Sequence, residues 1–136
     1  MPTLSPKQQR LAAVPLFAFC TPDQLQQVER LTEEVDVRAG DRVCSQGGLG
    51  HEFFIIESGR VSVERDGREV TQLGAGAHFG ELALLGAPLR NADVTALTDL
   101  RLIVIGVREF TSLLAQLPGL SVTLLRSLAQ RMQSDS

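Results

Sequence analysis

The chain has few of the side chains that bind metal ions or form disulfide frameworks. Its 136 residues include only two cysteines and two histidines. Cys20 and Cys44 lie too far apart for a zinc site, and the alternating apolar residues around Cys44 favour a buried thiol. His51 and His78 lack the close spacing of histidine ligands in a metal-binding barrel, and His78 beside Phe79 is better explained as a barrel residue. We therefore predict no metal and no cofactor, in a reducing, cytoplasmic setting.

Basic runs and long apolar segments are also missing. Thirteen lysines and arginines stand against 16 acidic residues, for a net charge of −3. This balance disfavours direct binding to nucleic acid or to an anionic membrane surface. No apolar stretch approaches the about 20 residues of a membrane helix, and the amino terminus lacks the apolar core of a signal peptide.

Recognisable catalytic groups are absent as well. Ser45, Ser58 and Ser62 fall in predicted turns or strands and have no evident base partner. The acids other than Glu81 fit solvated faces. We predict no catalytic residue, so the protein is not expected to be an enzyme.

The length and the 43% hydrophobic content predict one globular domain over residues 1–136. Its amino-terminal part, residues 1–34, has the pattern of two helices. Each begins with a capping residue followed by proline, and Pro15 separates them. The residues concerned are Ser5 with Pro6 and Thr21 with Pro22, and Leu25, Val28 and Leu31 share one face of the second helix.

Residues 35–106 change to short apolar runs separated by turn residues. The pairs Gly40-Asp41, Ser58-Gly59 and Asp66-Gly67 mark turns, and Asp66-Gly67 is a strong hairpin signal. In residues 61–64, valines alternate with Ser62 and Glu64, which predicts one inward face. The fold class is therefore mostly β with flanking helices (α+β), an antiparallel β-barrel or jelly roll.

Residues 107–134 return to a helical period. A first apolar stripe ends at Pro118-Gly119 and a second follows it. Such stripes are more often core than interface, so both a monomer and a dimer through the carboxy-terminal helix stay open. The stripe residues are Phe110, Leu113, Leu114 and Leu117, then Leu120, Leu124, Leu125, Leu128 and Met132.

The stretch FGELALLGAPLRNADV, residues 79–94, carries the most informative chemistry. Gly80 and Glu81 precede a short apolar turn of helix, whose exposed N–H groups suit an anion. Arg90 follows a turn and could bind the same anion through two hydrogen bonds. Glu81 would be a poor phosphate neighbour but a good acceptor for a sugar hydroxyl. The alternative is that Glu81 and Arg90 form a simple ion pair across a loop.

This stretch resembles the phosphate-binding cassette of the cyclic nucleotide-binding domain family, which includes catabolite-activator-type regulators and the regulatory subunits of cAMP-dependent kinases. FGELALL (79–85), GAPL (86–89) and RNADVTA (90–96) match its motif in order without a gap. RAGDRV (38–43) and FFIIESGRVSV (53–63) are similar to the family's barrel strands. The resemblance covers nearly the whole chain.

The resemblance implies a role for each residue of the cassette, 79–91. Glu81 would accept the ribose 2′-hydroxyl and Arg90 would bind the cyclic phosphate. The backbone N–H groups of Ala83 and Asn91 would complete the phosphate site, while Gly80 and Leu82 line the ribose. The last helix would cover the base through Leu124, Leu125 and Leu128. The family usually has alanine, serine or threonine where this chain has Asn91, which leaves the choice between cAMP and cGMP open.

We therefore expect a sensor of cyclic nucleotide, cAMP or cGMP, that couples binding to movement of its carboxy-terminal helix. It would act through a protein partner or a fused output domain, since no DNA-binding segment follows that helix in this sequence. Two alternatives stay open. The chain could be a degenerate barrel that serves as a protein-interaction module, or the sensor fragment of a larger transcription regulator.

Overall fold

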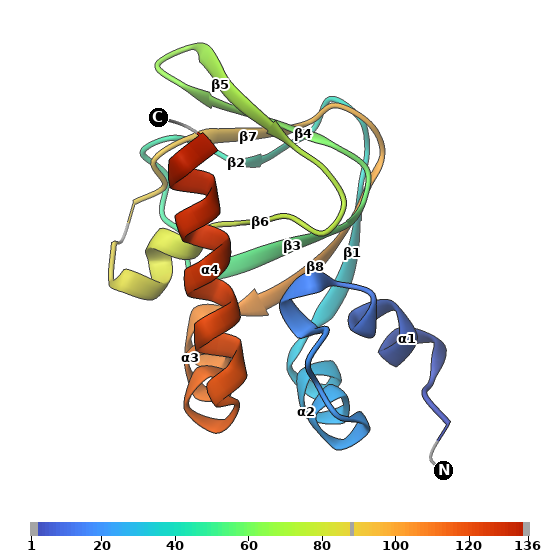
Figure 1. Cartoon of the computed structure of the whole chain (residues 1–136). Coiled ribbons are helices and arrows are strands. Elements are labelled where there is room, and N and C mark those ends of the chain that lie inside the picture. Colours follow the sequence, from blue (N-terminus) through green and yellow to red (C-terminus); the bar gives the residue numbers. More distant parts are fainter. Residues whose placement is uncertain (1–2, 88, 135–136) are drawn as a thin grey trace.

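Two antiparallel sheets and a layer of helices make up the domain in a computed structural model that describes residues 3–87 and 89–134 (Figure 1). The amino-terminal elements are α1 (Pro6–Ala12), η1 (Pro15–Phe17) and α2 (Pro22–Leu31). Strands follow as β1 (Glu33–Val37), β2 (Arg42–Cys44), β3 (Glu52–Ser58), β4 (Val61–Arg65), β5 (Arg68–Leu73) and β6 (His78–Phe79). The chain continues through η2 (Glu81–Leu85), β7 (Asp93–Ala96), β8 (Leu100–Gly106), α3 (Val107–Gln116) and α4 (Pro118–Ser134).

Each sheet has four strands. The first has the order β1-β8-β3-β6 and the second the order β2-β7-β4-β5, with antiparallel pairing throughout. The predicted α+β class with an antiparallel barrel-like body is confirmed. No helix in the described part of the chain is long and apolar enough to span a bilayer.

Strands β3 and β8 are buried on both faces, which explains their uninterrupted apolar runs. Phe53 and Ile55 of β3 face the helices, where they join a core with Phe17 of η1 and Phe110 of α3. Phe54 of β3 faces the opposite way, into the space between the two sheets. Cys44 lies in that second core and is free, as predicted. The first sheet therefore separates two hydrophobic cores.

Both amino-terminal helices begin where the sequence predicts. The Ser5 side chain accepts a hydrogen bond from the backbone N–H of Gln8, and Thr21 does the same with Gln24. In each case the glutamine side chain accepts from the N–H of the capping residue, which completes a capping box. The predicted apolar face of α2 needs one correction. Leu31 ends the helix and is 36% exposed, because the chain turns into β1 before this residue reaches the core.

The turn at Asp66-Gly67 joins β4 to β5 and both residues have positive φ, 52° and 78°. This is the backbone of a two-residue hairpin whose twist matches that of the strands. The predicted alternation in β4 is wrong at Ser62, which is 2% exposed. Its hydroxyl lies 2.6 Å from a carboxylate oxygen of Glu69 on β5, so a polar contact satisfies the buried side chain.

The carboxy-terminal helices bury only part of the predicted stripes. Leu120 and Leu124 of α4 belong to the helical core. Leu125 and Met132, by contrast, are 66% and 73% exposed. A helix that packs on one side only buries a narrow stripe, and α4 leaves these two residues on its outer face.

Three charged residues far apart in sequence meet beside α1. Arg10 donates to both carboxylate oxygens of Glu34 on β1, at 2.9 and 2.7 Å, and lies 3.1 Å from an oxygen of Glu57 on β3. The other Glu57 oxygen is buried, and no residue in the described part of the chain donates a hydrogen bond to it. Burial and the neighbouring Glu34 raise the pKa of Glu57 to about 7, whereas the hydrogen bond from Arg10 lowers the pKa of Glu34 to about 2.

We predict that the stability of the domain falls as the pH rises from about 4.5 to about 7. In this window the folded state holds the Glu57 proton more tightly than the unfolded chain does, so loss of that proton disfavours the folded state. The Glu57→Gln variant keeps a neutral side chain at this position, so its stability should change less across this window. Urea unfolding at several pH values measures the effect. Glu33→Gln, at an exposed acid of β1, is the control and should keep the wild-type slope. An equal slope in the wild type and in Glu57→Gln would contradict the assignment.

Candidate functional site

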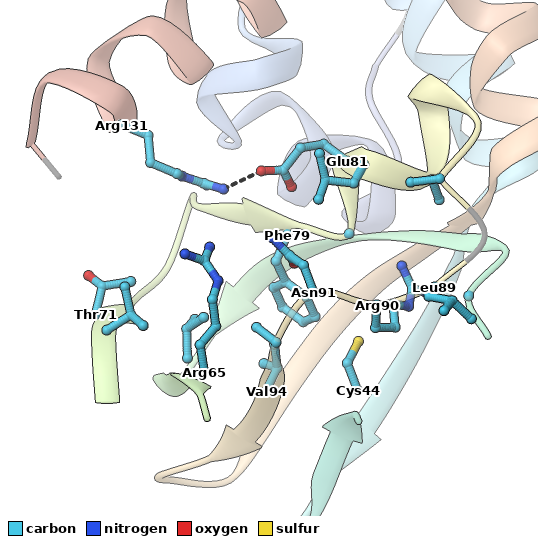
Figure 2. Close-up of a pocket in the computed structure, with 18 residues that line it drawn as sticks. Cys44, Arg65, Thr71, Phe79, Glu81, Leu89, Arg90, Asn91, Val94 and Arg131 are labelled. Atoms are coloured by element: carbon cyan, nitrogen blue, oxygen red, sulfur yellow. Dashed lines mark hydrogen bonds and ion pairs between the residues drawn. The ribbon is translucent and has the colours of Figure 1, made fainter. Parts of the chain in front are cut away.

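A hollow lies between η2, the inner face of the second sheet and the end of α4 (Figure 2). It encloses about 750 Å³ of space between atoms, its open mouth included. All six residues that the sequence singled out line it: Gly80, Glu81, Leu82, Ala83, Arg90 and Asn91. The cavity is not filled by leucine side chains.

Two glycines set the position of η2. Gly80 precedes this short 3-10 helix with φ of 88°, and Gly86 follows it with φ of 84°. Both values lie in the left-handed region that other residues adopt at a cost. A Cβ on Gly80 would also lie 2.9 Å from the carbonyl oxygen of Glu52, whereas no atom of the described residues lies within 4 Å of a Cβ on Gly86. Gly80 thus allows η2 to start directly against β3.

The Arg90 side chain is held by backbone and an aromatic ring. Its Nη2 donates to the carbonyl oxygen of Glu52 at 3.0 Å, and its Cζ lies 5.4 Å from the centre of the Phe54 ring. A Cβ on Gly50 would lie 2.0 Å from Arg90 Nε, so only glycine leaves room for this side chain. Among the described residues, no carboxylate comes within 4 Å of the guanidinium. Its charge remains available to an anion in the hollow.

Glu81 pairs with α4 and not with Arg90. Its Oε1 accepts from Nη1 of Arg131 at 2.6 Å, and its Oε2 lies 3.7 Å from Nδ1 of His78. Burial alone would raise the pKa of Glu81, but the contact with His78 and the charge of Arg131 outweigh it, and the pKa lies below its ordinary value. The carboxylate is therefore ionised and accepts hydrogen bonds. The simple ion pair between Glu81 and Arg90 is not found.

Arg131 is the site residue that sequence reasoning missed. Besides its pair with Glu81, it donates through Nη2 to the backbone carbonyl of His78. Figure 2 shows it extending from α4 toward Glu81. No local pattern in the sequence points to Arg131, because it lies 50 positions after Glu81 and the path of α4 brings the two together. The leucines predicted to cover this region, Leu124, Leu125 and Leu128, are not among the lining residues.

The hollow is positively charged in a chain of net negative charge. Three arginines and one glutamate are the charged residues among those that line it: Arg65, Arg90, Arg131 and Glu81. Arg65 and Arg90 lie toward opposite ends of the view in Figure 2. Such a concentration of positive charge in a partly enclosed site attracts anionic ligands.

The family model of the cyclic nucleotide-binding domain matches residues 34–117, which span the barrel, α3 and all residues that line the hollow except Arg131. The chain belongs to this family. The cyclic nucleotide-binding domain is a regulatory, non-catalytic fold, and the chain is a ligand-sensing module of that type. The predicted resemblance is confirmed.

Similar proteins come from several regulatory classes. A cyclic nucleotide-gated potassium channel of Rhizobium etli is 34% identical over 123 residues, which are 90% of this chain and 34% of the channel. The catabolite activator protein of Thermus thermophilus superposes with a TM-score of 0.77 at 28% identity, over 88% of this chain and 59% of that one. The regulatory subunit of a cAMP-independent protein kinase A from Trypanosoma brucei has a TM-score of 0.77 at 27% identity, over 90% and 45%. The chain spans about a third of the length of the first of these relatives.

We predict that Gly80→Ala destabilises the domain more than Gly86→Ala does. Both substitutions place alanine at positive φ, which costs on the order of 1 kcal/mol, but only the first also forces a Cβ against the Glu52 carbonyl. Urea unfolding of the two variants measures the difference. Equal losses would show that the close approach of η2 to β3 costs nothing.

Proposed function

We propose that the domain binds a cyclic purine nucleotide, cAMP or cGMP, in the hollow beside η2, and that α4 passes the binding event to another protein or domain. One observation carries the proposal. An arginine that no carboxylate of the described residues neutralises and an ionised glutamate line the same hollow. A cyclic nucleotide offers a phosphate for the first and a ribose hydroxyl for the second.

The cyclic phosphate is assigned to Arg90. The guanidinium is fixed on one side by the Glu52 carbonyl and by the Phe54 ring, so little side-chain freedom is lost on binding. A charge-assisted bond of this kind contributes about 1.5–3 kcal/mol. The neighbouring backbone N–H groups of Ala83 and Asn91, both on lining residues, are assigned to the remaining phosphate oxygens.

The ribose is assigned to Glu81, whose ionised carboxylate has lone pairs beyond the one that Arg131 occupies. Gly80 and Leu82 are assigned to the edge of the sugar. The base then extends toward Val63, Val70 and Thr71 of the second sheet, which line the rest of the hollow. Apolar side chains there suit the face of a purine ring.

Helix α4 is assigned the role of the lid. Its first half is anchored in the helical core through Leu120 and Leu124, while Arg131 near its end contacts the same carboxylate that is assigned to the ribose. A ligand that favours one position of this end shifts the helix toward that position. The exposed outer face of α4, with Leu125 and Met132, is a surface through which a partner, an output domain or a second copy could sense the shift.

We predict that cAMP or cGMP raises the melting temperature and that Arg90→Ala abolishes the rise. A ligand at 100 times its Kd stabilises the folded state by about 2.7 kcal/mol, a rise on the order of 10 °C for a domain of this size. Arg68→Ala, at an exposed arginine of β5 outside the hollow, should keep the rise. The absence of a shift with either nucleotide at millimolar concentration would exclude the proposed function and favour a protein-interaction module.

We further predict that Arg131→Ala weakens nucleotide binding about ten-fold, within the usual range of coupling between two elements. The variant leaves Arg90 and Glu81 in place but removes the contact that holds the end of α4 over the hollow. Calorimetric titration measures the affinity. Arg126→Ala, five residues earlier on the same helix and exposed, is the matched control. Unchanged or tighter binding by Arg131→Ala would rule out α4 as a lid in this form.

A further inference from the structure

His78 is a buried histidine between the candidate site and α4. It lies on β6, is 2% exposed, and stacks on Phe53 with ring centres 5.3 Å apart. Stacking accounts for the ring face but not for its two nitrogens. A phenylalanine would fill the same space without burying polar atoms, so the nitrogens need a physical explanation.

The two nitrogens face different elements. Nε2 lies 2.8 Å from the hydroxyl oxygen of Ser127 on α4. Nδ1 is buried and has no hydrogen-bond partner among the described residues, and Oε2 of Glu81 lies 3.7 Å from it. That separation exceeds a hydrogen bond by a few tenths of an ångström. A small rotation of the Glu81 side chain would close it.

The charge of Glu81 selects the arrangement of protons on this ring. A neutral imidazole has one donor nitrogen and one acceptor nitrogen. The ionised carboxylate beside Nδ1 favours the tautomer with its proton on Nδ1, which leaves Nε2 to accept from the Ser127 hydroxyl. In this arrangement one ring orders the carboxylate and the helix together. Among the described residues, Arg131 of α4 is the other charged group at Glu81, and Arg126 of α4 lines a second hollow together with His78 and Ser127.

We propose that His78 is a positioning residue that couples α4 to the nucleotide site: through Nδ1 it orients the Glu81 carboxylate, and through Nε2 it docks Ser127 of α4. The proposal rests on the proposed function for its ligand. A change at the ring should therefore affect both the affinity for nucleotide and the docking of the helix. Changes that spare one nitrogen should separate the two effects.

Substitutions at His78 can test the two nitrogens one at a time. The amide nitrogen of asparagine is as many bonds from Cα as Nδ1 of histidine, so His78→Asn can replace that nitrogen. The amide nitrogen of glutamine is as many bonds from Cα as Nε2, so His78→Gln can replace the other. His78→Phe keeps the stacking and removes both nitrogens. Ser127→Ala removes only the α4 partner. His51→Phe, at the exposed histidine of the chain, is the control for loss of a histidine.

Two measurements on the full chain report the two roles. Calorimetric titration with cAMP and cGMP reports the orientation of Glu81, and amide hydrogen exchange of residues 124–131 without ligand reports the docking of α4. His78→Phe should weaken nucleotide binding roughly ten-fold, as expected for one bond to a charged group, and speed exchange in this segment. His78→Asn should restore most of the affinity but leave exchange fast. His78→Gln should show the reverse pattern, with weak nucleotide binding and slow exchange. Ser127→Ala spares the Nδ1 side of the ring, so it should keep most of the affinity while exchange in this segment is fast.

The outcomes separate this inference from the proposed function. Wild-type affinity and wild-type exchange in His78→Phe would overturn the inference, as would equal rescue by asparagine and glutamine. If the wild-type protein binds neither nucleotide, the proposed function and the Glu81 role fail together. The exchange data then decide the α4 role alone, and slow exchange in both His78→Phe and Ser127→Ala would overturn that role too. If His78→Phe does not fold, the asparagine, glutamine and Ser127→Ala variants still give the test.

Discussion

The contact between Glu81 and Arg131 joins the two parts of the site. The first residue starts η2 and the second lies near the end of α4, and their ion pair is only partly exposed to solvent. Partial burial strengthens the attraction between the two charges but also costs them hydration, and it makes the loss of one partner costly. The position of α4 and the charge inside the hollow therefore depend on each other. A change in either residue changes both.

Arg90 is held in a different way. It contacts a carbonyl oxygen and an aromatic ring, so its charge is oriented without being neutralised. The site thus combines one arginine already paired with a carboxylate and one that is free to meet an anion. This division of roles explains why the cassette places its acid and its base far enough apart that they do not pair with each other.

Features set by neighbouring residues could be predicted from the sequence. The caps at Ser5 and Thr21 and the hairpin turn at Asp66-Gly67 depend on local hydrogen bonds and backbone preferences, and the structure has them. The cassette is also local, which is why all six of its predicted residues line one hollow. Their roles toward a ligand remain a proposal.

Features set by packing could not be predicted in the same way. Arg131 lies 50 positions after Glu81, and only the path of α4 brings the two together. The same path leaves Leu125 exposed although its periodicity resembles that of Leu124, because the helix covers the core with one side only. The Glu57 contact with Arg10 likewise joins residues 47 positions apart, on α1 and β3. Single-sequence patterns carry no information on these distances.

The wall formed by β3 and β8 limits which parts of the molecule can move. Since these strands bury side chains on both faces, separating either core from them would expose the other side of the same strands. The wall should therefore behave as one rigid, cooperative block. The elements that pack against this wall on one side only should move more easily, above all η2 and the second half of α4 beyond Leu124. Ligand binding in the hollow would then displace η2 and the end of α4 relative to the two sheets, and the sheets themselves would not rearrange.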